Sequence, residues 1–389
     1  MTSPIFILAG EPSGDQLAAH IMRAVNLHYQ SPVWIGVGGA LMQDEGLSSL
    51  VEIERMSIIG FGNAILAYQR LSALADRLVE HVISVRPKIV LTIDNKGFSI
   101  RFATRLRRRM KAVGWSAPII HCVAPTVWAW GRWRAKKFAN TLDGLLCLFP
   151  FEPEYFRYSH LDAHFIGHPE AFKNYQPKKW VKGKKSDSRQ IVLLPGSRHS
   201  EIKQILPEML VASSILRRHD RRFSFVLPTL PSLLPLIKSY VDGYDVDIIE
   251  GPKDLISILQ SSTAMIATSG TVTLQAALCG TNGVTCYRTG MLNAFIGRHL
   301  VDLERVILPN AILGRRVYPF YFQETATAKA LASAVLDVVE DRDSNERLLG
   351  AARELKSLLT GDKEAFSELV ISALQNWLGP PIKSAWVKT

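Results

Sequence analysis

Short apolar runs rich in β-branched residues alternate with longer amphipathic stretches along almost the whole chain. In the longer stretches the apolar residues recur every three to four positions, as they do on one face of a helix. Such alternation predicts parallel sheets whose strands are joined by helical crossovers. The predicted strands fall into two sets: residues 5–9, 33–37, 89–93, 119–123 and 145–148, followed by residues 191–194, 223–227, 246–249, 264–267 and 284–287.

A polar and basic stretch, residues 173–187, separates the two sets of strands and contains proline and glycine. We interpret it as a linker between two α/β domains. The prediction is an N-terminal domain over residues 1–172 and a second domain over residues 188–355. Residues 356–389 are helical in pattern and form a tail that could pack back on the N-terminal domain.

Composition places the chain among ordinary globular proteins. Its 389 residues are 47% hydrophobic and 21% charged, which excludes a disordered or collagen-like chain. No apolar run reaches the length of a transmembrane helix, and the first residues lack the features of a signal peptide. The four cysteines are scattered without metal-type spacing. We therefore expect a cytoplasmic protein with reduced cysteines and no bound metal.

Positive charge is in excess, since 46 Lys and Arg outnumber 35 Asp and Glu. Such a surplus favours nucleic acid, an anionic membrane or a phosphate-bearing substrate, without choosing among them. The densest basic cluster includes Arg101, Arg105 and Arg108, and nucleic acid is disfavoured because no known binding motif accompanies it. A glycine-containing apolar segment precedes a predicted helix; its large apolar residues are Ile58, Ile59, Phe61, Ile65 and Leu66.

These two features have two interpretations. The apolar segment could be a packed loop and the basic cluster a solvated helix face. Alternatively, the segment is an exposed lip that touches lipid beside a basic patch that attracts an anionic bilayer.

Acidic residues follow the predicted strands of the first domain, where ligands of open α/β sheets bind. Glu11 and Asp15 follow the first strand and Asp94 follows the third, while Glu152 lies after the fifth. Each of the first three could accept a proton from a substrate hydroxyl. The alternative is that they cap the helices that begin there.

The second domain carries two small-residue turns, each between a predicted strand and a predicted helix. Free backbone N–H groups at such helix starts bind anions, and an arginine beside one of them favours a diphosphate. Because no GxxxxGK[ST] sequence occurs, nucleotide hydrolysis is disfavoured. The candidate residues for a nucleoside diphosphate are Gly196, Ser197, Arg198, Glu201, Ser269, Gly270 and Thr271.

Motifs along almost the whole chain occur in the order and spacing of the lipid-A-disaccharide synthases. They lie at residues 9–15 (AGEPSGD), 36–39 (GVGG), 125–130 (PTVWAW), 149–152 (FPFE), 165–169 (FIGHP), 194–198 (LPGSR), 269–271 (SGT) and 308–310 (LPN). The chain thus resembles this family, and the resemblance implies a GT-B-like fold of two doubly wound parallel-sheet domains facing a central cleft. It also adds Asn310 and Gln323 to the candidate UDP-sugar residues.

The resemblance further implies an inverting transfer that needs neither metal nor cofactor. The family joins UDP-2,3-diacylglucosamine to 2,3-diacylglucosamine 1-phosphate and releases UDP, at the cytoplasmic face of the Gram-negative inner membrane. The expected partners are therefore these two acylated glucosamines and the anionic inner-membrane surface, with no nucleic acid. Whether the chain forms a homodimer is left open.

Three positions depart from the family pattern. Gly97 stands where the family has the aspartate that is its leading base candidate, and Gln275 and Phe320 replace two further acids. Two hypotheses follow. The chain is a glycosyltransferase in which Asp94, Glu11 or Asp15 serves as the base, or it is a catalytically silent paralogue that binds UDP-sugar or lipid as a regulator or scaffold.

Overall fold

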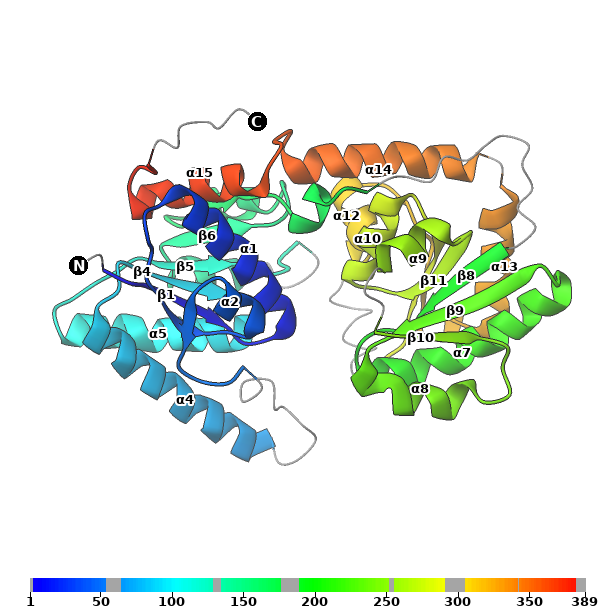
Figure 1. The fold of residues 1–389 in the computed structure, drawn as a ribbon, viewed down its shortest axis with the longest axis horizontal. Helices are drawn as coiled ribbons and strands as arrows, with labels where there is room; N and C mark the ends of the chain where they lie inside the picture. The colour runs from blue at the N-terminus through cyan, green and yellow to red at the C-terminus, as the bar shows by residue number, and fades with distance from the viewer. Residues whose placement is uncertain are drawn as a thin grey trace. The chain divides into compact units, whose positions relative to one another are not determined.

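The chain folds into two compact α/β units (Figure 1). The computed structural model describes residues 3–53, 64–128, 134–175, 189–251, 255–290, 305–341 and 343–382. The first unit consists of Met1–Phe172 together with Leu359–Thr389, and the second of Lys173–Leu358. The final segment of the chain therefore belongs to the unit with which the chain begins.

The first unit is built on a seven-stranded sheet in which every pairing is parallel, in the order β3-β2-β1-β4-β5-β6-β7. The order reverses between β1 and β4, so the loops that follow these two strands diverge there and leave room for a ligand. The strands are β1 (Ile5–Ala9), β2 (Trp34–Val37), β3 (Leu47–Ser49), β4 (Ile89–Ile93), β5 (Ile119–Cys122), β6 (Gly144–Cys147) and β7 (Asp162–Phe165).

Two separate cores cover the two faces of this sheet, because successive strand residues point to opposite sides. Phe6 and Leu8 of β1 pack with α4 (Ala64–Val85) and α5 (Lys96–Ala112). Ile5 and Ile7 pack with α1 (Pro12–His28) and α15 (Phe366–Leu378). The shorter helices of the unit are α2 (Ala40–Asp44), α6 (Arg134–Ala139), η1 (Pro153–Phe156) and η2 (Pro169–Phe172).

The C-terminal helix α15 lies against α1, as Figure 1 shows, although the two are far apart in sequence. Its last turn is held by side chains of the first unit. Lys88 Nζ donates to the carbonyl oxygen of Leu378 at 2.6 Å, and the Tyr29 hydroxyl donates to that of Gly379 at 2.8 Å. Both donors satisfy carbonyl groups that the end of a helix leaves without intrahelical partners.

The second unit has a six-stranded parallel sheet in the order β10-β9-β8-β11-β12-β13. Here the order reverses between β8 and β11, the counterpart of the reversal in the first unit. Its strands are β8 (Arg189–Leu194), β9 (Phe223–Thr229), β10 (Asp247–Glu250), β11 (Ala264–Thr268), β12 (Asn282–Tyr287) and β13 (Phe320–Phe322).

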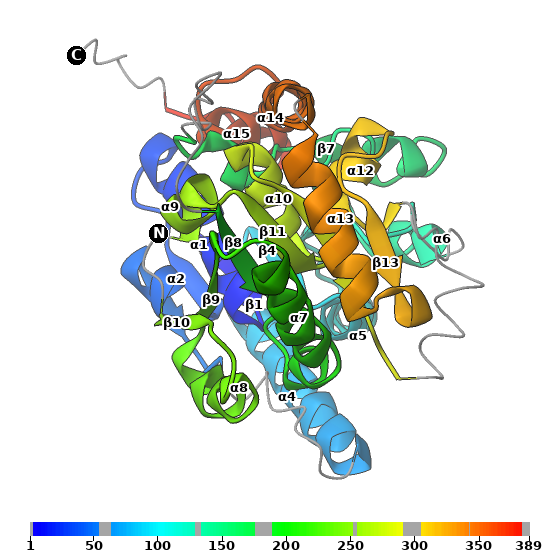
Figure 2. The same cartoon turned by 90° about the vertical axis from the view of Figure 1, so that its right-hand side faces the viewer.

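On one face of this sheet lie α7 (His199–His219) and α13 (Ala328–Glu340), which pack side by side (Figure 2). The other helices in the described part of this unit are α8 (Leu234–Val241), α9 (Leu255–Ser261), α10 (Thr271–Cys279), α12 (Leu308–Leu313) and α14 (Ser344–Thr360), with the short η3 (Pro231–Leu233) and η5 (Gln323–Thr325). The sequence predicts the end of the second domain at residue 355. This residue lies within α14, which continues to Thr360.

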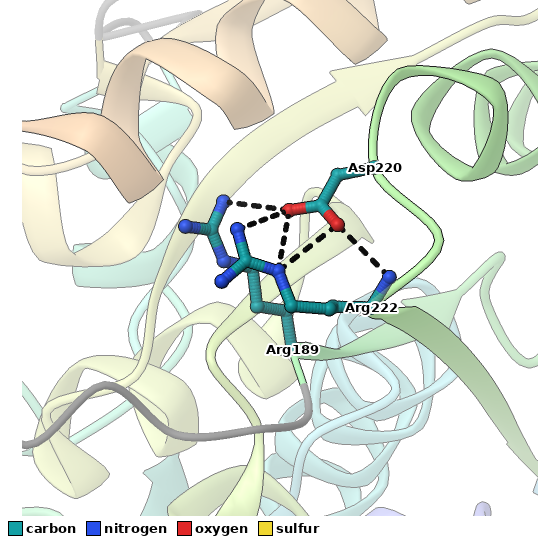
Figure 3. A network of polar contacts seen from close by, with 3 residues as sticks. All are labelled: Arg189, Asp220 and Arg222. Atoms are coloured by element: carbon teal, nitrogen blue, oxygen red, sulfur yellow. Dashed lines mark hydrogen bonds and ion pairs between the residues drawn. The ribbon is translucent and has the colours of Figure 1, made fainter.

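A charged cluster ties together the starts of β8 and β9 and the end of α7 (Figure 3). Asp220, the residue that caps the C-terminus of α7, accepts hydrogen bonds from the backbone and side chain of Arg222, with Nη2 at 2.7 Å. Arg189 Nη1 lies 3.5 Å from the same carboxylate. The hydrogen bonds from Arg222, with a smaller contribution from Arg189, lower the pKa of Asp220 to about 2.

The two parallel-sheet domains predicted from the sequence are confirmed, and each of the ten predicted strands corresponds to an observed strand. The sequence missed β3, β7 and β13. All three are edge strands of three or four residues and largely half-exposed, so they lack the continuous apolar run that marks a central strand.

Candidate active site

A cavity of about 380 Å³ opens in the second unit where the strand order reverses. Its walls are the loops that follow β8, β9 and β11. Seven of the nine residues predicted to bind UDP-sugar line it: Gly196, Ser197, Arg198, Glu201, Ser269, Gly270 and Thr271. The structure therefore brings both predicted diphosphate turns to one cavity.

Two helices begin at this cavity, α7 after Arg198 and α10 after Gly270. Neither N-cap residue bonds the first turn through its side chain. Their first backbone N–H groups, at the positive ends of the helix dipoles, can therefore serve an anionic ligand.

The β8–α7 turn depends on Gly196, whose φ of 104° is rarely adopted by other residues. A Cβ atom at this position would lie 2.4 Å from Glu201 Oε2. Glu201 is buried and accepts a hydrogen bond from Arg198 Nη1 at 2.9 Å. The Arg198 side chain is nevertheless 74% exposed, so its guanidinium stays accessible to a ligand.

The other two candidates for UDP-sugar binding, Asn310 and Gln323, are not among the residues that line this cavity. Asn310 is buried, where its side chain accepts from the backbone of Val317 and Tyr318 and donates to the Tyr318 carbonyl at 2.9 Å. The Gln323 side chain bonds both backbone groups of Thr289. Both amides therefore hold backbone segments in place. The turns at residues 196–198 and 269–271 were easier to predict, because each turn carries its anion-binding groups within one short segment at the end of a strand.

In the first unit, Glu11 and Asp94 follow β1 and β4, the two strands at its reversal of strand order. Asn95 caps α5, because its side chain accepts from the Phe98 N–H. The residue that caps α5 is therefore Asn95 and not Asp94. Within the described part of the chain, no group donates a hydrogen bond to the Asp94 carboxylate, which lies half-buried at the end of β4.

The Asp15 carboxylate is occupied by hydrogen bonds to the backbone. Its buried carboxylate accepts N–H groups from Gly39 at 2.7 Å and from Leu41 and Met42 at 3.2 Å each. These donors belong to the start of α2. The capping alternative is therefore favoured for Asp15, although the helix that it caps is α2 and not its own helix α1.

Glu152 is a residue to which sequence reasoning assigned no role. It is 2% exposed, and its Oε2 atom accepts from the N–H groups of Leu148 and Phe149 at 3.0 and 3.1 Å. Burial raises its pKa to about 7, against the opposing influence of the Phe149 N–H group and of Lys96. The sequence indicates only that Glu152 follows a strand, because the burial of a single side chain cannot be read from the sequence.

Around this carboxylate lies an aromatic cluster that accounts for one of the two tryptophans in the segment after β5. Trp128 packs edge-on against Phe149 and Phe151, whose rings stack on each other at 5.8 Å. Trp128 is 7% exposed and therefore contributes to the core of its own unit. Residues 129–133, with Trp130, lie outside the described residues.

The predicted basic patch is partly used within the fold. Arg105 donates to the Ser72 carbonyl at 2.9 Å and lies 3.5 Å from Asp76, so it joins α5 to α4. Arg101 Nε donates to the Gly97 carbonyl, while its side chain and that of Arg108 lie on the exposed face of α5. The apolar residues of the proposed lip, Ile58, Ile59 and Phe61, lie outside the described residues, as do the side chains of Ile65 and Leu66.

The three departures from the family pattern lie in two helices and at the start of one strand. Gly97 is exposed in the first turn of α5, and the nearest heavy atom to a Cβ built there is Arg101 Nη2, at 3.9 Å. Gln275 lies in α10 and Phe320 begins β13. Among the described residues, no helix has the length and apolarity to cross a membrane, and no group of acidic, histidine or cysteine side chains could hold a metal ion.

Comparison with known proteins agrees with this geometry. The family model described as lipid-A-disaccharide synthetase matches residues 5–370. A lipid-A-disaccharide synthase of Rhodopseudomonas palustris (strain ATCC BAA-98 / CGA009) is 35% identical over 367 residues, covering 92% of each chain.

Two solved structures share the fold. The glycosyltransferase of kitacinnamycin has a TM-score of 0.61 at 13% identity, covering 97% of this chain and all of that one. The UDP co-structure of S. aureus MnaA has a TM-score of 0.60 at 12% identity, covering 97% of both chains. At these identities the likeness concerns the GT-B fold alone.

Proposed function

Because the chain belongs to the lipid-A-disaccharide synthase family, we propose that it joins UDP-2,3-diacylglucosamine to 2,3-diacylglucosamine 1-phosphate and releases UDP. Membership makes the chain a glycosyltransferase of the hexosyltransferase type, acting on a UDP-sugar and a lipid phosphate. The silent-paralogue alternative is not favoured, because related chains of 34–35% identity are named as the synthase.

The cavity of the second unit is the proposed UDP site, and it is the observation that carries the proposal. Two helix N-termini and the exposed Arg198 guanidinium converge on it, which suits the two phosphates of UDP. As the bond between the anomeric carbon and UDP breaks, negative charge grows on the leaving phosphate. N–H groups and a guanidinium already in position stabilise that charge without reorganisation.

The first unit is proposed to supply the base. The acceptor hydroxyl oxygen forms the new bond to the anomeric carbon on the face opposite UDP, and its proton passes to a carboxylate. Asp94 is the first candidate, because it lies at the reversal of strand order and another residue caps α5. Glu11 competes from the neighbouring strand, whereas Asp15 is committed to capping α2.

Attachment to the cytoplasmic face of the inner membrane is a further part of the proposal. Arg101 and Arg108 present positive charge on the exposed face of α5, and the substrates carry acyl chains in the family. Basic residues at an anionic bilayer contribute about 1 kcal/mol each. The association would be peripheral.

The experiment that tests the UDP site is titration calorimetry on Arg198→Ala. Loss of a charge-assisted contact of about 1.5–3 kcal/mol should weaken UDP binding on the order of 10–100-fold. The matched control is Arg218→Ala, which removes an exposed arginine near the other end of α7 and should bind UDP like the wild type. Equal UDP affinity in wild type and Arg198→Ala would remove the cavity from the proposal.

The overall reaction is tested by supplying both acylated glucosamines and measuring released UDP. Product that requires both substrates supports the transferase. UDP binding without any turnover would instead restore the silent paralogue.

A further inference from the structure

The main chain at Asp94 lies in a conformation that needs support from its surroundings. Asp94 and Asn95 connect β4 to α5 with φ values of 49° and 40°, both in the left-handed region. Asparagine and aspartate visit this region as single residues, because the Cβ atom there crowds the following carbonyl oxygen. Two in succession persist only where other contacts hold them, and such positions cluster at sites of function. The contacts that hold this pair therefore decide where the Asp94 side chain points.

Hydrogen bonds hold the peptide groups on both sides of the Asp94 Cα atom. On one side, the Asp94 N–H donates to the carbonyl oxygen of Cys122, the last residue of β5, at 2.8 Å. On the other side, the Ser99 hydroxyl donates to the Asp94 carbonyl oxygen, also at 2.8 Å. Because the N, Cα and C atoms of a residue set the direction of its Cα–Cβ bond, these two hydrogen bonds fix the direction in which the carboxylate leaves the main chain.

The first turn of α1 confines the Asp94 side chain from a third direction. A Cβ atom at Gly14, in that turn, would lie 3.9 Å from Asp94 Cβ and 3.5 Å from the carbonyl oxygen of Ile93. The start of α1 therefore packs closely against the end of β4. The root of the Asp94 side chain is held in place, whereas its carboxylate accepts no hydrogen bond from the described part of the chain and stays available to a substrate.

The Ser99 hydroxyl is bonded differently from an ordinary hydroxyl within a helix. A helical serine or threonine commonly donates to the carbonyl four residues earlier, as Thr104 does to Ile100 at 2.7 Å on the same helix. Ser99 Oγ instead reaches past Asn95 to Asp94, while the Ser99 N–H donates to the Asn95 carbonyl at 3.0 Å. One residue, only 2% exposed, is thus bonded to both left-handed residues, and its burial protects these bonds from water.

We propose that Ser99 is a positioning residue for the transfer reaction: its buried hydroxyl holds the Asp94 main chain in the left-handed conformation and so aims the Asp94 carboxylate at the acceptor hydroxyl. The inference rests on the proposed function, because it gives Ser99 a part in that same reaction. Ser99 bonds to the main chain and not to the substrate. The proton still passes from the acceptor hydroxyl to the Asp94 carboxylate.

Ser99→Ala tests this role by removing the hydroxyl alone. Without that donor, the peptide group between Asp94 and Asn95 is free to rotate toward a commoner backbone conformation, and the carboxylate moves with it. Misplacing a reacting group by about 1 Å can cost about 100-fold in rate, so we expect kcat to fall about 10- to 100-fold. The affinity for UDP, whose proposed site lies in the second unit, should not change when measured by calorimetry.

A double-mutant cycle separates positioning of Asp94 from general damage to the first unit. If Ser99 acts through Asp94, then removing the Asp94 carboxylate leaves nothing to position. We therefore expect Ser99→Ala to lower the residual rate of Asp94→Asn by less than about 2-fold, which is the usual scatter of such cycles. A structural defect would lower the rate by the same factor in both backgrounds. Equal losses in wild type and in Asp94→Asn would overturn the inference.

The matched control is Thr104→Val, which removes an exposed hydroxyl from the same helix while leaving the β4–α5 connection unaltered. It should keep the wild-type kcat. If Ser99→Ala also keeps the wild-type kcat, the inference is overturned, while wild-type turnover leaves the proposed function intact. If the wild type itself makes no product from the two acylated glucosamines, the proposed function fails and the inference fails with it.

A second variant covers the case in which Ser99→Ala does not fold. Ser99→Cys fills the buried site with a side chain of similar shape, but a thiol is only a weak hydrogen-bond donor. We expect kcat to fall again, and only while the Asp94 carboxylate is present. Ser99→Thr keeps the hydroxyl and should retain more of the wild-type kcat than Ser99→Cys does. An unchanged kcat in Ser99→Cys would overturn the inference.

Discussion

Replacing Gly97 by aspartate restores the carboxylate of the family pattern and should stabilise the first unit. Position 97 is exposed in the first turn of α5, and a Cβ there meets nothing closer than Arg101 Nη2 at 3.9 Å. The substitution therefore costs no steric rearrangement. It also places a negative charge where the helix dipole favours one, four residues before an arginine.

Three small contributions add up. Aspartate improves on glycine within a helix by a few tenths of a kcal/mol, the dipole contributes about 0.3–1 kcal/mol, and the pair with Arg101 contributes about 0.2–0.5 kcal/mol. Together they stabilise the fold by about 1 kcal/mol. For a domain of this size, that raises the Tm of the first unit by about 2–4 °C.

Thermal unfolding at low ionic strength measures this, with Gly97→Asn as the matched control that has the same shape without the charge. Gly97→Asp should be the more stable variant, and about 1 M salt should remove most of the difference because it screens exposed charges. An aspartate variant no more stable than the asparagine variant would refute the reasoning. UDP release measured on the same samples tells whether the absence of this acid limits the wild-type rate, since Gly97→Asp should then be faster.

Three further predictions concern the base, the charged cluster and the membrane. Asp94→Asn should lower turnover by about 10²–10⁴-fold at unchanged UDP affinity, measured by UDP release and calorimetry; an unaffected rate would make Glu11 the better candidate. The lowered pKa of Asp220 stabilises the fold above about pH 4 and this contribution is lost as pH falls toward 2, so the Tm difference between wild type and Asp220→Asn should shrink over that range. The wild type should float with anionic liposomes at low salt, and Arg101→Ala/Arg108→Ala should bind less; a wild type that stays soluble contradicts membrane attachment.

The central strands could be predicted because their residues are buried on both faces and read as continuous apolar runs. The run at residues 5–9 corresponds residue for residue to β1, an interior strand that pairs with β2 on one side and β4 on the other. The edge strand β13 has only half-exposed residues and follows a proline, so nothing in its local sequence separates it from a loop. Pairing with β12 makes it a strand, and pairing is not a local property.

The candidate site was predictable where chemistry and backbone lie in one short segment. The turns at residues 196–198 and 269–271 each combine a strand end, small residues and a helix start, and they meet at one cavity. The function of a lone side chain was harder to predict. Asp15 caps a helix that begins 25 residues later in the chain, and Asn310 serves the backbone of Val317 and Tyr318, relations that depend on tertiary contacts.

The docking of α15 on α1 has a consequence for the order in which the protein is made. The ribosome completes β1 to β7 long before it reaches residues 366–378, so in a nascent first unit the part of α1 that α15 covers remains exposed. During that interval the whole second unit is synthesised and can fold. The unit whose synthesis begins first is therefore completed last. A chain that ends before Leu378, whose carbonyl accepts from Lys88, would leave a nearly complete first unit exposed to chaperones and proteases.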